Sequence, residues 1–263
     1  MWVLQTNLID IHQVTDVVNA LKSISAHYTD VSVIPFSDEF VTPLELTHTN
    51  IIPYGSTKLC KIAERRGWLG LFFDRSTFRV DAWNKQRTDM LNGDAETMTV
   101  KEAMGVFETR DPDSVWFIRP IEDLKQFNGT VTTAKEIAHW MSSVESGNFS
   151  FDESTVVSVA SPKQLLAEWR YFVVNRKVVS GSLYRMRGLK LTRRETDREV
   201  LEEAQRFADK WLPHETCVMD LALTPDGVKV IEFNCLNSSG FYYHDVGAIV
   251  SAVDQYFNKK AVQ

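Results

Sequence analysis

A predicted β-hairpin near the C-terminal end constrains the fold more than any other segment. Two runs rich in β-branched and apolar residues, 217–223 and 228–234, flank Pro225-Asp226-Gly227, a sequence typical of a tight turn. Glu232 and Asn234 lie two residues apart in the second run, so their side chains point to the same face of the strand. The segment therefore predicts an antiparallel strand pair with one polar face.

The length of the turn decides whether Asp220, in the first strand, joins that polar face. A three-residue loop, in which a type I turn is followed by a glycine bulge, pairs Thr224 with Val228 and Asp220 with Glu232. A two-residue loop instead pairs Asp220 with Ile231 and turns the aspartate to the opposite face. The Pro-Asp-Gly sequence favours the three-residue loop, so we predict that Asp220 and Glu232 converge.

The side chains of Asp220, Glu232 and Asn234 supply two carboxylates and an amide oxygen, which suit a hard cation such as Mg²⁺. A polar strand face that simply meets water is the plainer interpretation of these residues. The loop that follows, residues 235–240, favours the metal site because its small residues offer N–H groups and hydroxyls to an anion. A metal face beside an anion-binding loop indicates phosphate chemistry.

The composition is that of an ordinary soluble globular protein, with 44% hydrophobic and 24% charged residues in a chain of 263. A net charge of −6 and a pI near 5.6 give no global positive field, so a nucleic-acid partner is not expected. One basic cluster is either a solvated loop or a phosphate-facing surface, and the sequence leaves both open. Its members are Arg185, Arg187, Lys190, Arg193 and Arg194.

The three cysteines stand alone, without a Cys-x-x-Cys pair. Cys60, Cys217 and Cys235 therefore argue for a reducing compartment and against a zinc site. No histidine lies near Cys235 in the sequence, so we interpret this cysteine as a packing residue and not as a nucleophile. The N-terminus shows no basic signal-peptide region, and no apolar run reaches the roughly 20 residues of a membrane span. We expect a cytoplasmic protein without a membrane partner.

The first 75 residues alternate strand-like and helix-like patterns, which predicts a small α/β domain with a mostly parallel sheet. Strands are expected at 2–8, 31–36, 51–54 and 70–73, and helices at 14–28 and 57–66. Further on, helices are expected at 83–91, 100–107, 134–144, 195–211 and 245–257, strands at 115–120 and 156–160, and a hairpin from 167–174 to 177–185.

Four motifs in this order resemble the ATP-grasp superfamily, especially a clade common in phages and bacteria that carries an arginine in the first phosphate-binding strand. They are Trp-Phe-Ile-Arg119-Pro with Lys125-x-Phe-x-Gly129, the strand 156–161, Glu168-Trp-Arg170, and Asp220 followed by Glu232-Phe-Asn234. The resemblance covers about residues 115–257. It implies an N-terminal α/β (pre-ATP-grasp) domain at 1–113 and an ATP-grasp domain at 114–263, whose two α+β subdomains, 114–160 and 161–263, clamp ATP.

The resemblance also implies which residues bind the nucleotide. Arg119 would grip the ATP phosphates bidentately, where most family members carry a lysine, and Lys125 would join it. Glu168 would hold the ribose hydroxyls. The adenine would be read by the backbone and apolar side chains of the hinge strand, at Val157, Ser158, Val159 and Ala160.

For catalysis, the resemblance implies that Asp220, Glu232 and Asn234 bind Mg²⁺ ions that bridge the β- and γ-phosphates. Arg170, which shares a strand face with Glu168, could pair with that carboxylate or meet phosphate or substrate. Arg185 or Arg187 would stabilise the γ-phosphoryl group in transfer; the sequence leaves open which does so. The acceptor substrate or transferred phosphoryl group would lie at Asn237, Ser238, Ser239 and Gly240.

The function that the resemblance implies is an ATP-dependent ligase. It would activate a carboxylate as an acylphosphate and join it to an amine, with release of ADP and phosphate; both substrates are small molecules or peptides. A kinase-like phosphoryl transfer at the same site and a non-catalytic nucleotide-binding module are the alternatives. The oligomeric state cannot be read from the sequence.

Overall fold

The computed structural model describes residues 1–7, 11–35, 37–46, 48–122, 127–142 and 151–261. Their strands form three sheets, and the mixed architecture confirms the predicted fold class. The N-terminal unit is a three-stranded parallel sheet in the order β2-β1-β3, accompanied by two helices. Its elements are β1 (Trp2–Gln5), α1 (Ile11–Ser23), β2 (Tyr28–Val31), β3 (Ile52–Tyr54) and α2 (Thr57–Arg65).

One strand predicted in this unit is absent: Gly70 lies in a turn, and residues 71–73 pair with no strand. A Cβ atom at Gly70 would lie 2.5 Å from the carbonyl oxygen of Ile51, so the two backbones lie too close for any larger residue there. The N–H of Phe72 donates to the side chain of Asn237 instead of to a neighbouring strand. The segment 70–73 therefore contacts a distant loop through its backbone. The sequence pattern cannot distinguish such a segment from a strand.

A four-stranded antiparallel sheet in the order β4-β7-β5-β6 forms the second unit. Its elements are β4 (Glu96–Thr99), α4 (Val100–Thr109), β5 (Val115–Pro120), β6 (Thr130–Thr133), α5 (Ala134–Ser142) and β7 (Val156–Ala160). The helices α4 and α5 pack together and share one core with β5 and β7. The sequence missed β4 and β6 because both are short and largely exposed.

The predicted boundaries at 113/114 and 160/161 stay predictions. However, β4 belongs to this sheet although it precedes residue 114 in the chain.

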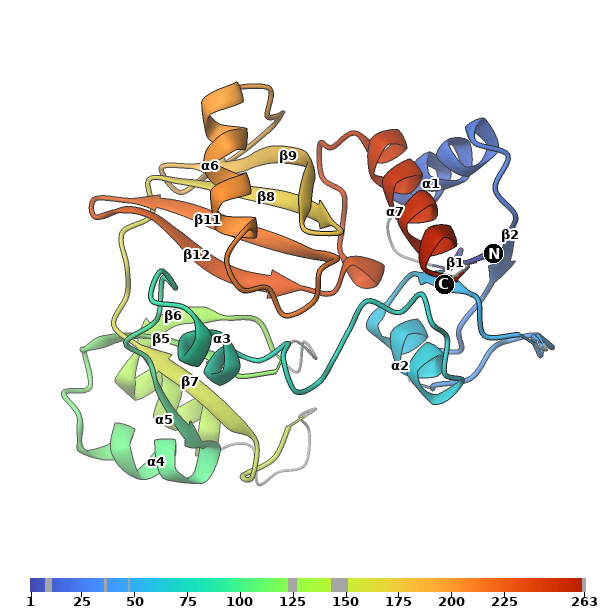
Figure 1. Cartoon of the computed structure of the whole chain (residues 1–263). Helices are drawn as coiled ribbons and strands as arrows, with labels where there is room; N and C mark the ends of the chain where they lie inside the picture. Colours follow the sequence, from blue (N-terminus) through green and yellow to red (C-terminus); the bar gives the residue numbers. More distant parts are fainter. Residues whose placement is uncertain (8–10, 36, 47, 123–126, 143–150, 262–263) are drawn as a thin grey trace.

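A five-stranded antiparallel sheet in the order β10-β9-β8-β11-β12 forms the third unit. Its elements are β8 (Ala167–Val174), β9 (Lys177–Met186), β10 (Leu189–Arg194), α6 (Arg198–Ala208), β11 (Cys217–Thr224) and β12 (Gly227–Asn234). The short helix α3 (Val80–Gln86) precedes the second unit in the chain, and the chain ends with a 3₁₀ turn, η2 (Leu236–Ser238), and α7 (Val246–Ala261). In Figure 1 the second unit lies below this sheet, and α7 lies beside α1 of the N-terminal unit.

Alternate side chains of β8 face two separate cores. Phe172 and Val174 pack with residues of α1 and α7, whereas Tyr171 and Val173 pack with residues of α6. This alternation follows from the period of two along a strand. Because Phe172 is fully buried, its burial contributes about 1.5–3 kcal/mol to stability. The five-stranded sheet is thus held on both faces, which makes it a rigid support for polar side chains.

The register of β11 and β12 confirms the predicted pair of Asp220 and Glu232, but the predicted cause is wrong. The turn has two residues, since Thr224 pairs with Gly227 and Leu221 pairs with Val230. A register shift between Leu221 and Asp220 leaves Ile231 as an extra residue, and this β-bulge brings Glu232 opposite Asp220. The bulge corrects the one-residue slip that the shorter turn introduces.

Candidate functional site

A buried ion pair between Arg170 and Asp220 forms the centre of the candidate site. β8 and β11 are neighbours, and the register places the two residues directly opposite each other. The guanidinium Nε and Nη2 atoms of Arg170 donate to the two carboxylate oxygens of Asp220, at 2.8 and 2.7 Å. Asp220 is 2% exposed and Arg170 is 8% exposed. The two parallel charge-assisted hydrogen bonds fix both side chains in one orientation.

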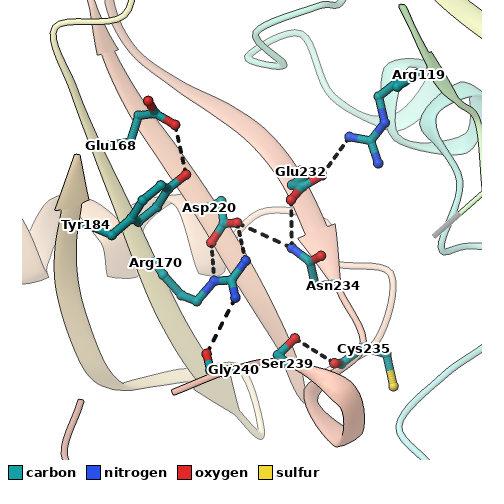
Figure 2. A network of polar contacts seen from close by, with 10 residues as sticks. All are labelled: Arg119, Glu168, Arg170, Tyr184, Asp220, Glu232, Asn234, Cys235, Ser239 and Gly240. Carbon is teal, nitrogen blue, oxygen red and sulfur yellow. Dashed lines mark hydrogen bonds and ion pairs between the residues drawn. The ribbon is translucent and has the colours of Figure 1, made fainter. Parts of the chain in front are cut away.

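Asn234 joins this pair to Glu232. Its Nδ2 atom donates to Asp220 Oδ2 at 3.4 Å and to Glu232 Oε1 at 3.2 Å. The predicted convergence of the three side chains is therefore confirmed, as Figure 2 shows. Two carboxylates and one amide within hydrogen-bonding distance are a donor set that fits a hard cation. Their role as metal ligands stays a prediction.

Arg119 reaches this cluster from the four-stranded sheet. Its Nη1 atom donates to Glu232 Oε2 at 2.7 Å, so an ion pair links β5 to β12 (Figure 2). The guanidinium also lies 5.5 Å from the ring centroid of Trp83, in a cation–π contact. The arginine of the first predicted phosphate strand thus faces the predicted metal ligands.

The pKa shifts of the cluster follow from burial and from the two arginines. Burial raises the pKa of Asp220, and the Arg170 guanidinium only partly offsets this effect. Burial acts in the same direction on Glu232, but the charges of Arg119 and Arg170 outweigh it and lower the pKa of this carboxyl. Burial disfavours the charged form of Arg170, but Asp220 raises the pKa of the guanidinium above its usual value. The two arginines therefore already offset part of the negative charge of Asp220 and Glu232, the charge that would also attract a bound cation.

A cleft of about 240 Å³ opens beside Glu232 and Asn234, between the four-stranded and five-stranded sheets. Its wall includes Arg119, Glu168 and Tyr184. Tyr184 Oη donates to one carboxylate oxygen of Glu168 at 2.9 Å, and Arg185 Nη1 donates to the other at 3.1 Å. Burial, followed by the charges of Asp220 and Glu168, raises the pKa of Tyr184, so its hydroxyl stays protonated and donates. The cleft thus combines cationic and anionic groups.

Two of the predicted phosphate-binding residues are not brought to this cleft by any described contact. Lys125 lies outside the described residues. Arg187 is exposed in the turn between β9 and β10, where its φ of 49° is left-handed. By contrast, Arg185 is held at the rim by its bond to Glu168. The sequence left open which of the two arginines serves the phosphates, and the geometry favours Arg185.

The predicted hinge strand β7 is central in its sheet, which limits the adenine role that the resemblance implies. Residues 157–159 pair with β4 on one side and with β5 on the other. Ala160 pairs only with β5, so the side of this residue that would face β4 has no paired neighbour. Ser158 is buried, and its Oγ atom has no hydrogen-bond partner among the described residues. Strand pairing therefore engages the backbone of Val157, Ser158 and Val159, and favours Ala160 for a backbone contact to adenine.

Of the four predicted substrate residues, two have side chains committed to internal bonds. Asn237 is fully buried, and its amide bonds to the N-terminal unit. The Oγ atom of Ser239 donates to the carbonyl of Cys235 at 2.7 Å. Ser238 lies at a small pocket, and the Gly240 carbonyl accepts from Arg170 Nη1 at 3.5 Å. Asn237 and Ser239 therefore shape the loop and do not offer their side chains to a substrate.

Tyr184 was not indicated by the sequence, although this residue lines the cleft. A register shift on β9 pairs Arg185 with Glu168 and Leu183 with Trp169, which leaves Tyr184 as the extra residue of a bulge. Tyr242 was missed as well; its ring lies 4.7 Å from the Arg170 guanidinium, and its φ of 47° is left-handed. Simple alternation along the strands does not predict either position, because bulges and left-handed residues break the period of two.

Other kinds of site find less support in the part of the chain that the structure describes. No group of three or more His, Cys, Asp and Glu residues there could hold a metal ion. None of its helices is long and apolar enough to cross a membrane. The three cysteines, all within the described ranges, form no disulfide with one another.

The chain matches known proteins mainly in structure. The crystal structure of the D-cycloserine synthetase DcsG aligns with a TM-score of 0.63 and 9% identity, over 98% of this chain and 99% of that chain. The D-alanine–D-alanine ligase from Bacillus anthracis aligns with a TM-score of 0.58 and 9% identity, over 98% and 97%. The ATP-grasp ligase PsnB, complexed with minimal precursor, aligns with a TM-score of 0.56 and 12% identity, over 97% and 98%.

No curated protein sequence matches the chain. However, the family described as "ATP-grasp domain, R₂K clade family 3" matches residues 78–253, a region that includes the ion pairs, the cleft and all three predicted metal ligands. The structural matches, at identities of 9–12%, agree in fold. The chain therefore belongs to the ATP-grasp superfamily, in family 3 of its R₂K clade, and has the fold of the ATP-grasp ligases.

Proposed function

We propose that this ATP-grasp ligase activates a carboxylate as an acylphosphate and joins it to an amine, with release of ADP and phosphate. The observation that carries the proposal is the charge arrangement at the cleft. Arg119 faces Glu232 from one sheet, while Arg170 holds Asp220 in the other, with Asn234 between the two carboxylates. Phosphoryl transfer needs positioning and charge stabilisation more than a side-chain nucleophile.

Asp220, Glu232 and Asn234 would hold Mg²⁺, which would offset the charge of the β- and γ-phosphates when bound. A solved structure of PsnB contains Mg and ADP, which supports the same pair of ligands for this fold. Arg119 would leave Glu232 and bind phosphate oxygens through its planar guanidinium. Arg170 would keep Asp220 oriented throughout, because its two hydrogen bonds are buried.

Glu168 would bind the ribose hydroxyls at the same cleft. Tyr184 and Arg185 fix its carboxylate from two directions, so the acceptor oxygens have one defined orientation. Arg185 is half-exposed and lies at the rim, where it can also meet the γ-phosphoryl group. Arg187, which is exposed in the β9–β10 turn, is the other candidate for that part.

The structural matches support two classes of substrate. MdnC was solved with the precursor peptide MdnA, and PsnB with precursor peptides, whereas DcsG is a D-cycloserine synthetase. The carboxylate and the amine of this enzyme therefore belong to peptides or to small molecules. The three thiols, which form no disulfide, agree with a reducing compartment, and we place the reaction in the cytoplasm.

The test is incubation with Mg²⁺, ATP and pooled carboxylates and amines, with separation of ADP from AMP. Formation of ADP that depends on both pools supports the ligase. Formation of AMP and pyrophosphate would instead indicate adenylation and would contradict the acylphosphate. A Glu232→Gln variant is the internal control, because it removes one charge from the cluster and is expected to abolish turnover with little loss of fold.

A further inference from the structure

The side chain of Asn237 joins three segments that are far apart in the sequence. Its Nδ2 atom donates to the carbonyl oxygens of Pro53, at 2.7 Å, and Gly70, at 2.8 Å. Its Oδ1 atom accepts from the N–H of Phe72 at 2.8 Å. The residue is 0% exposed. All these partners belong to the N-terminal unit, whereas Asn237 itself follows β12 of the five-stranded sheet.

Two backbone contacts of the same loop strengthen this connection. The N–H of Gly55 donates to the carbonyl oxygen of Asn237 at 2.9 Å, and Tyr54 Oη donates to the carbonyl of Ser239 at 3.1 Å. The second of these bonds is buried. The turn from β3 to α2 and the segment 70–72 therefore hold residues 237–239 from two sides.

The loop is also connected directly to the polar cluster. Asn234 lies three residues before Asn237, and the carbonyl of Gly240 accepts from Arg170. Figure 2 shows the Gly240 carbonyl at the Arg170 guanidinium, which in turn pairs with Asp220. A displacement of the loop therefore moves both the end of β12, which carries the proposed metal ligands Glu232 and Asn234, and the Gly240 carbonyl that accepts from Arg170.

We propose that Asn237 is a positioning residue through which the N-terminal unit sets the geometry of the loop 236–240, and with it the acceptor side of the site. The expected effect on kcat rests on the proposed ligase function. The expected effect on the structure of the loop does not. The cleft proposed to bind ATP is lined by residues that include Asn234 but not Asn237. Loss of Asn237 therefore affects the chemical step more than nucleotide binding.

The experiment compares Asn237→Ala with Gln205→Ala. Gln205 is a suitable control because its amide also makes three hydrogen bonds, to Arg176, Val178 and Asp209, and connects α6 to β9 away from the loop. Both variants are studied below their unfolding temperatures, by steady-state kinetics and by hydrogen–deuterium exchange with mass spectrometry. Tyr54→Phe, which removes one buried hydrogen bond to the loop and keeps the ring, serves if Asn237→Ala does not fold.

For Asn237→Ala we expect kcat to fall about 100-fold, as a displacement near 1 Å can cause, while the KM for Mg·ATP stays within about threefold. Deuterium uptake should rise in peptides covering 53–55, 70–72 and 232–242. Gln205→Ala should lose stability without either change, and Tyr54→Phe should show a smaller change of the same kind.

An unchanged kcat in Asn237→Ala, or unchanged exchange in residues 232–242, would overturn the proposal. A wild-type enzyme without any ligase turnover would refute the proposed function instead. The exchange measurement would then still decide whether Asn237 holds the loop.

Discussion

At the scale of single residues, the site depends on buried charges that are matched in pairs. Arg170 and Asp220 form a bidentate ion pair in which both side chains are almost completely buried. A buried pair of this kind adds little to stability compared with apolar residues of similar size, but the loss of one partner leaves an uncompensated charge. We therefore attribute the pair, which lies beside Asn234 and Glu232 on the same sheet, to its role in the site and not to stability.

The first prediction follows from this asymmetry. Arg170→Ala should destabilise the protein by about 3–5 kcal/mol, because it leaves the carboxylate of Asp220 buried and unpaired. The double variant Arg170→Met with Asp220→Leu should recover most of that loss but show no ligase activity. Urea unfolding of both variants measures the difference. Equal destabilisation of the single and double variants would show that the ion pair is needed for folding itself.

A second prediction concerns His244, whose ring packs edge-on against Phe172 and whose Nδ1 atom is 2.9 Å from Ser180 Oγ. Burial, together with the charges of Arg170 and Arg194, lowers its pKa to about 3. The unfolded chain therefore binds a proton near pH 6.5 that the native protein does not bind, so stability falls as the pH decreases from 6.5 toward 3.

The slope from this group approaches roughly 1.4 kcal/mol per pH unit in that range. Thermal unfolding between about pH 7 and pH 4 should show a smaller loss of stability in His244→Gln than in the wild type. If the two proteins lose stability in parallel, the imidazole is protonated in the native state and our interpretation of its burial is wrong.

At the scale of elements, the hairpin β11–β12 shows how far a sequence pattern leads. The pattern predicted the two strands and the shared face of Glu232 and Asn234, because period-two alternation is encoded locally. It added Asp220 to that face through a three-residue loop, whereas the structure has a two-residue turn and a bulge. It did not predict the bulge at Ile231, since bulges depend on how the strand fits its neighbours in the sheet. The bulge at Tyr184 was missed for the same reason.

Long-range contacts were also beyond the sequence pattern. The resemblance placed Asn237 where substrate or the transferred phosphoryl group binds, yet its bonds to Pro53 and Gly70 span more than 160 positions. By contrast, the helices α2 and α4 begin at the residues expected, since their caps, Ser56 and Thr99, are local signals.

The third prediction tests the turn of this hairpin. Gly227 has a φ of +101°, which disfavours any side chain, whereas Gly105 lies in α4 with open space around it. Gly227→Ala should therefore destabilise the protein by about 1 kcal/mol, and Gly105→Ala should stabilise it by about 0.5–1 kcal/mol. Chemical denaturation of the two variants measures both changes in the free energy of unfolding, with their signs. A neutral Gly227→Ala would mean that the turn adopts another conformation in solution.

At the scale of the whole molecule, the three units meet around the polar cluster. The five-stranded sheet carries the carboxylates, the four-stranded sheet contributes Arg119 across the cleft, and the N-terminal unit holds the loop after β12. The site therefore combines contributions from all three units. A domain-by-domain prediction gives the fold class correctly but not the contacts that assemble the site.

The fourth prediction concerns the arginine that crosses the cleft. Arg119→Ala should weaken ATP binding by about 10- to 100-fold, the usual effect of losing hydrogen bonds to a charged group, and should leave adenosine binding unchanged. Calorimetric titration with both ligands measures this difference. Arg198→Ala, which removes an exposed ion pair on α6, is the control. Equal losses for ATP and adenosine would place Arg119 away from the phosphates.

A labelling experiment tests most directly whether this site transfers the γ-phosphoryl group of ATP to a carboxylate, as we propose. Once a substrate pair is identified, the carboxylate can be labelled with ¹⁸O and the mass of the released phosphate measured. In an acylphosphate pathway a carboxylate oxygen attacks the γ-phosphorus, and the amine later expels phosphate with that oxygen. We therefore expect one ¹⁸O atom in the phosphate for each amide formed. Unlabelled phosphate, or label in AMP, would contradict it.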